Sequence, residues 1–143
     1  MSLRYFAIST LLLATLIILL EAFAAAAVPD IGASIQRDQQ RGYPELRNFD
    51  FQEWSRTALL GSAIAICLSI AFIISAVGLL RRRSWARGLY LASSLGVVAF
   101  MVASCIQHLD RASMLHVGYG LALFSFAWWF LFHSRASVPF RST

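Results

Sequence analysis

Four long apolar runs constrain this chain most, because each is about as long as a bilayer is thick. They cover residues 5–28, 57–80, 88–107 and 114–133. A helix needs about 20 apolar residues to cross the hydrocarbon core. The runs lack the alternation of polar and apolar residues that is typical of membrane-barrel strands, and backbone groups in lipid must be satisfied within the segment. The sequence therefore predicts an all-α integral membrane protein with a four-transmembrane-helix bundle.

Composition supports the same class and excludes others. Hydrophobic residues make up 59% of the chain and charged residues 13%, against about 45–50% and 25% in soluble domains. This excludes a soluble enzyme, a disordered chain and a nucleic-acid-binding domain. Cys67 and Cys105 both lie inside apolar runs at different depths, which predicts buried thiols and no disulfide framework. We expect one membrane domain over residues 1–143.

The arginines indicate the orientation of the chain in the membrane. All 12 basic residues are arginines, and the net charge is +5. If the N-terminus is cytoplasmic, the inner side carries seven arginines and no acid, whereas acids outnumber arginines outside. Positive charge in short loops marks the cytoplasmic side. We therefore predict a bacterial inner-membrane protein with both termini in the cytoplasm. The turn predicted to anchor this topology contains Arg81, Arg82, Arg83, Trp85 and Arg87.

Aromatic side chains gather near the predicted membrane surfaces. Those nearest the inner surface are Tyr5, Phe6, Trp85, Trp128 and Trp129. Amphipathic rings prefer the level of the lipid headgroups. The pattern predicts an aromatic belt and not a ligand-binding site.

The first apolar run also allows a second interpretation, a cleaved signal peptide covering residues 1–27. Arg4 would be its positive start, and the alanines at 24–27 would offer small residues for cleavage. Its apolar stretch is slightly longer than the about 7–15 residues usual in signal peptides. This favours a first spanning helix, but both interpretations stay open at this point.

The segment 29–56 is the one sizeable part predicted to lie outside the membrane. Pro29 and Asp30 predict a break followed by a helix cap, and residues 31–41 a short helix that stops at Gly42. Residues 45–56 can continue into the second span. We expect a short helical extracytoplasmic segment, and a docking surface for a membrane partner is the alternative.

Small residues recur every four positions in two of the runs. They are Gly61, Ala65 and Ser69 in the second run and Gly88, Ala92 and Gly96 in the third. Such faces let helix backbones approach closely in lipid. Because the connecting turn is short, we expect these two helices to pack as an antiparallel hairpin. A face for a homo-oligomer or another membrane protein is the alternative.

Glu21 is the one ionisable residue well inside a predicted span, and such residues are functional candidates. Polar residues at a matching predicted depth are Ser62, Ser104 and Tyr119. An acid in the first helix loosely resembles the arrangement in four-helix small multidrug transporters, without their surrounding motif. The resemblance implies proton- or cation-coupled transport. A structural carboxyl, hydrogen-bonded within the bundle, is the simpler interpretation.

No residue pattern indicates catalysis or a cofactor. His108, Asp110, Arg111 and His116 crowd the turn between the third and fourth runs, but their spacing fits no known metal-ligand signature. Nucleophile-elbow, zinc-protease and phosphate-loop motifs are not found in the sequence. We therefore expect a non-enzymatic accessory or interaction subunit, without cofactor or nucleic acid. Its expected partners are the lipid bilayer and a membrane protein or a second copy of the chain.

Overall fold

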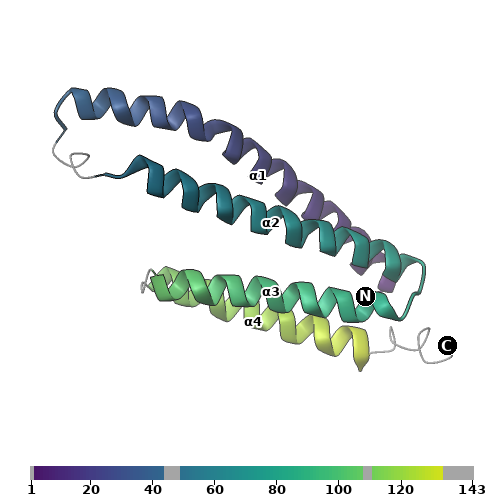
Figure 1. The fold of residues 1–143 in the computed structure, drawn as a ribbon. Coiled ribbons are helices and arrows are strands. Elements are labelled where there is room, and N and C mark those ends of the chain that lie inside the picture. Colours follow the sequence, from purple (N-terminus) through teal and green to yellow (C-terminus); the bar gives the residue numbers. More distant parts are fainter. Residues whose placement is uncertain (1, 44–48, 108–110, 134–143) are drawn as a thin grey trace. The chain divides into compact units, whose positions relative to one another are not determined.

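The computed structural model of this protein describes residues 2–43, 49–107 and 111–133. Within these ranges every regular element is an α-helix and no strand occurs. The four helices, drawn in Figure 1, are α1 (Leu3–Gln40), α2 (Phe51–Leu80), α3 (Trp85–Gln107) and α4 (Arg111–Phe132). The predicted all-helical class is confirmed for this part of the chain.

Three of the described helices are long and apolar enough to cross a membrane. They are α1, α2 and the Trp85–Ala103 part of α3. In α4 the apolar stretch with described side chains is Gly120–Phe132, which is shorter. A span needs about 20 residues. The chain is thus a helical membrane protein with three candidate spans among its described residues.

The prediction of a helix break at Pro29 is wrong. Residues 31–40 do not form a separate helix, because α1 runs unbroken from Leu3 to Gln40 with Pro29 inside it. Proline cannot donate a hydrogen bond to the carbonyl four residues earlier, and its ring crowds that carbonyl. Membrane helices tolerate proline, and α1 continues through Pro29 to Gln40.

The predicted stop at Gly42 is confirmed. Gly42 has a φ of 81°, which glycine adopts without steric cost. Its N–H donates to the Gln39 carbonyl at 3.0 Å, and the Tyr43 N–H donates to the Asp38 carbonyl at 3.4 Å. These two bonds form a Schellman motif, which satisfies the last carbonyls of α1.

α2 ends in the same motif, but with an arginine in the left-handed position. Arg82 has a φ of 55°. Its N–H donates to the Leu79 carbonyl at 3.0 Å, and the Arg83 N–H donates to the Gly78 carbonyl at 2.9 Å. Left-handed backbone costs a residue other than glycine roughly 1–2 kcal/mol. The turn therefore stores a small strain at Arg82.

Replacing Arg82 by glycine should raise the free energy of unfolding by about 1 kcal/mol, because glycine relieves this strain. The measurement is unfolding in a non-ionic detergent as the fraction of denaturing detergent rises. Arg83→Gly is the matched control, since it removes the same charge at a position without positive φ. An equal gain in both variants would show that charge and not backbone strain is responsible.

The chain divides into two compact units, which are described separately. The first contains residues 1–15 and 68–143, and the second contains residues 16–67. In the first unit all four helices contribute to one core. Its buried residues are Phe6, Ala7, Ala76, Leu79, Ala86, Leu91, Ala127, Phe130 and Leu131.

Phe6 lies at the centre of this core. Its ring centroid is 5.1 Å from that of Tyr90 and 4.9 Å from that of Phe130, distances at which aromatic rings attract each other. Only 6% of Phe6 is exposed, so the prediction that it belongs to an aromatic belt is wrong. Tyr5 next to it is exposed, as are Trp128 and Trp129.

Glycines lie at two close approaches between helices in the first unit. A Cβ atom on Gly78 would lie 2.6 Å from the Ala86 Cβ atom, across the α2–α3 turn. One on Gly120 of α4 would lie 2.9 Å from the Met101 sulfur of α3. The Ala86 Cβ atom is buried and fixed to its backbone, so α2 and α3 depend on Gly78 for their close packing. The Met101 side chain is flexible and can shift away from a side chain at position 120.

Candidate functional site

Glu21 lies in the second unit, where α1 and α2 run antiparallel. At one end of this pair the Gln39 side-chain amide donates to the Phe49 carbonyl at 3.1 Å. Farther along, Gly32 lies against the Phe51 ring, leaving no space for a Cβ atom. This close pairing brings the side chain of Glu21 on α1 towards α2.

The Ser62 hydroxyl donates a hydrogen bond to the Glu21 Oε2 atom at 2.7 Å. Both residues are half-buried. The structure thus brings together two of the four residues that the sequence placed in one polar site. For the other two, Ser104 and Tyr119, the structure describes the helix but not the side chain. Whether these four residues carry a function stays a prediction.

The Glu21–Ser62 contact differs from most other hydroxyl contacts in the described helices. The hydroxyls of Ser9 and Thr15 each donate to a carbonyl four residues earlier in α1. Ser75 and Ser93 also donate within their own helices. Such bonds satisfy a hydroxyl without joining two segments. Ser62 instead links α2 to α1, so this contact ties the two helices together.

The pair can persist in both protonation states of the acid. A serine hydroxyl donates to a carboxylate, and it can also accept a hydrogen bond from a protonated carboxyl group. The geometry is therefore compatible with a structural link and with a carboxyl group that gains and loses a proton.

The other polar candidates lie largely beyond the described part. His108 and Asp110 are outside the described residues, as are the side chains of Arg111, His116 and Cys105. Cys67 is a free thiol and is exposed, so the prediction that it is buried is wrong. Among the described side chains, no three or more His, Cys, Asp or Glu residues lie together.

The small residues predicted to form packing faces differ in their surroundings. On α2, Gly61 and Ala65 are half-buried and Ser69 is buried. On α3, a Cβ atom on Gly96 would lie 2.9 Å from the Leu68 Cδ2 atom of α2. Near Gly88 no described atom lies within 4 Å of such a Cβ position, and Ala92 is exposed. The part of the α3 face nearest the turn is therefore open.

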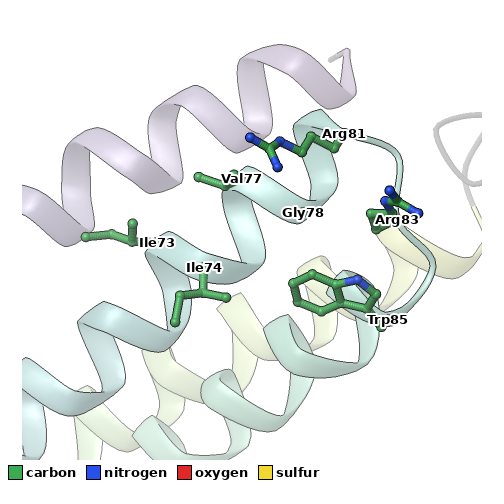
Figure 2. Close-up of a pocket in the computed structure, with 7 residues that line it drawn as sticks. All are labelled: Ile73, Ile74, Val77, Gly78, Arg81, Arg83 and Trp85. Carbon is green, nitrogen blue, oxygen red and sulfur yellow. The ribbon is translucent and has the colours of Figure 1, made fainter.

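The arginine turn after α2 lies beside an open groove of about 480 Å³. Its lining residues, which Figure 2 shows, are Ile73, Ile74, Val77, Gly78, Arg81, Arg83 and Trp85. Arg82 lines a smaller groove of about 230 Å³, together with Arg4 and apolar residues near the start of α1 and the end of α2. Four of the five residues of the predicted topology anchor are thus divided between two grooves.

Arg87, the fifth residue of that predicted anchor, faces α4. Its guanidinium carbon lies 5.0 Å from the centroid of the Phe132 ring. A cation over an aromatic face within about 6 Å is attracted by the ring. Arg87 therefore contributes to the contact between α3 and α4.

Sequence reasoning missed the residues that begin α2. The Asp50 carboxylate accepts hydrogen bonds from the Gln52 and Glu53 N–H groups at 2.9 and 3.1 Å. The Phe49 and Trp54 rings pack with centroids 6.3 Å apart. This is an N-cap with a hydrophobic staple. The signal was present, because an acid followed three residues later by glutamate is typical of a helix start.

Comparisons of the sequence with protein-family models and curated proteins, and of the fold with solved structures, found no match.

Proposed function

We propose that residues 1–143 form one multi-pass membrane domain with four spans, in which the described part of α4 belongs to the fourth. We further propose a bacterial inner-membrane location with both termini cytoplasmic. Three described helices with the length and composition of spans support this proposal. The distribution of the arginines supports the orientation.

A topology test uses reporter fusions to the full chain. A reporter active only in the cytoplasm should work when fused after Thr143 and should fail when inserted at residues 36–42, because residues 29–56 lie outside the membrane in this proposal. Activity of the second fusion would contradict the proposed orientation. Mass spectrometry of the intact mature protein tests cleavage after residue 27, which would remove the first span.

The proposed function is that of a non-enzymatic accessory or interaction subunit, acting through its helix faces and the outer segment 29–56. The observation that carries it is the open face of α3. Gly88, Ala92, Leu95 and Ala99 lie on one side of this helix, and all four are exposed. Small residues on an open face allow a second helix to approach closely. The face suits a partner span or a second copy of the chain.

Substitution by leucine on this face should abolish association without unfolding the chain. We expect Gly88→Leu and Ala92→Leu to lose a partner that co-purifies with the wild type in mild detergent, or to lose a self-association measured by light scattering. The added side chain prevents close backbone contact. Ala63→Leu is the control, because Ala63 is an exposed alanine on α2. Equal association of all variants would contradict the proposal.

A second candidate, proton- or cation-coupled transport through Glu21, is favoured by the Ser62 hydrogen bond to that carboxyl group. Ionisable residues in spans commonly mark transport pathways. The test compares the pH-driven flux of cationic compounds in proteoliposomes containing wild type or Glu21→Gln. Flux that is present in the wild type and lost in the variant would support transport and contradict the accessory function. Flux absent from both would count against transport.

A further inference from the structure

The groove beside the arginine turn combines an apolar wall with a positive end. Ile73, Ile74 and Val77 come from successive turns near the end of α2 and form the apolar wall. In Figure 2, Arg81 extends over Val77, while Arg83 lies above Trp85 on the turn. The groove thus leads from apolar side chains in a candidate span to guanidinium groups at its end.

Gly78 and Trp85 give the groove its shape. A Cβ atom on Gly78 would lie 3.0 Å from the Trp85 Cη2 atom and 3.2 Å from its Cζ2 atom. The absence of a side chain at Gly78 therefore lets the indole ring lie against α2. Trp85 remains 52% exposed, so one part of it forms a wall while the rest is accessible. Indole rings prefer the headgroup level of a membrane.

Among the described residues of the first unit, the charges of the groove have no acidic counterpart. Arg81 and Arg83 are both exposed, and the described residues of the first unit include no Asp or Glu. The described acids all lie in the second unit. An anion that reaches this end of α2 would therefore meet positive charge without competition from a carboxylate among the described residues of that unit. Arginine binds phosphate well because its guanidinium offers several donors.

We propose that this groove binds an anionic glycerophospholipid. The phosphate lies at Arg81 and Arg83, and one acyl chain lies along Ile73, Ile74 and Val77. The apolar wall favours a lipid over a free phosphate ion, because a small anion would leave that wall uncovered. This proposal goes beyond the accessory function and does not depend on it, since it requires only the membrane location of α2.

The test measures lipid retention by the purified full chain in detergent with native mass spectrometry. The probes are dioleoylphosphatidylglycerol and, as the neutral lipid, dioleoylphosphatidylcholine. We expect the anionic lipid to be retained more strongly, and Arg81→Gln/Arg83→Gln to weaken this retention about tenfold through loss of charge-assisted hydrogen bonds. The control, Arg37→Gln/Arg56→Gln, removes the same charge from exposed residues of the second unit and should keep the preference.

A second variant tests the apolar wall with the arginines in place. Val77→Trp fills the groove, so we expect it to lose the anionic lipid, whereas Leu60→Trp at an exposed position of the second unit should retain it. The proposal would be overturned if Arg81→Gln/Arg83→Gln and the control Arg37→Gln/Arg56→Gln weakened retention of the anionic lipid equally. Such a result would mean that the lipid responds to the net charge of the protein and not to this groove. Equal binding of the neutral lipid, or displacement by inorganic phosphate alone, would also overturn it.

Discussion

Gly78→Leu should lower the free energy of unfolding by about 3 kcal/mol, one of the two largest effects expected of any single substitution in this chain. Even the first atom of a side chain would lie 2.6 Å from the Ala86 Cβ atom and 3.0 Å from the Trp85 ring. Ala86 is fully buried, so it has no free space into which it can move. The helices α2 and α3 would have to separate next to the core that Leu79 shares with Ala86.

Gly88→Leu is the matched control, since the same substitution on α3 meets no described atom within 4 Å. It should not lower the free energy of unfolding, because the site is open and leucine is a better helix former than glycine. Both variants are unfolded in the same mixed detergent, with helix content followed by circular dichroism. Similar losses at the two positions would mean that leucine in a helix, and not the close approach at Gly78, causes the effect.

Ser62→Ala should destabilise the chain by about 2 kcal/mol, because it leaves the Glu21 carboxyl group without the hydroxyl that donates to it. Removing one partner of a hydrogen bond to a polar group in a low-dielectric region costs more than removing both. The double variant Glu21→Leu/Ser62→Ala should therefore regain most of the lost stability. The measurement is a double-mutant cycle of unfolding free energies in detergent.

Ser94→Ala and the single variant Glu21→Leu distinguish an interaction between Glu21 and Ser62 from the general effect of losing a hydroxyl group. Ser94→Ala removes a hydroxyl that donates to the Tyr90 carbonyl of its own helix at 2.9 Å, and it should cost less than Ser62→Ala. Additive effects of Glu21→Leu and Ser62→Ala would show that the two side chains do not interact in solution. Additivity would also remove the structural support for a shared polar site.

The existence of the helices followed from the sequence more directly than their ends. Long apolar runs allow little besides a helix in lipid, and Gly42 stops α1 because its backbone takes a positive φ. The continuation of α1 through Pro29 could not be predicted from local rules. Local rules place the end of a helix before a proline, whereas membrane helices tolerate proline inside them. The start of α2 at Phe51 was recognisable from Asp50 and Glu53.

For the candidate site, the sequence predicted residue types better than contacts. Glu21 stands out as an acid in an apolar run, and Ser62 was one of three residues at a matching depth, but depth cannot say which side of a helix a residue faces. The groove at Arg81 was not predicted, because its wall depends on how the Trp85 ring lies over Gly78. Phe6 was assigned to a membrane surface for the same reason, since its burial depends on packing by Tyr90 and Phe130.

The left-handed backbone at Arg82 has a consequence for how this short run of identical residues tolerates change. The turn sends Arg81 and Arg83 to one groove and Arg82 to another, so the three positions obey different substitution rules. At positions 81 and 83 the chemistry of the side chain matters, and lysine preserves the charge but not the planar fork of donors. At position 82 the backbone favours glycine or asparagine, neither of which carries charge. Three adjacent arginines are therefore expected to accept different replacements over evolution.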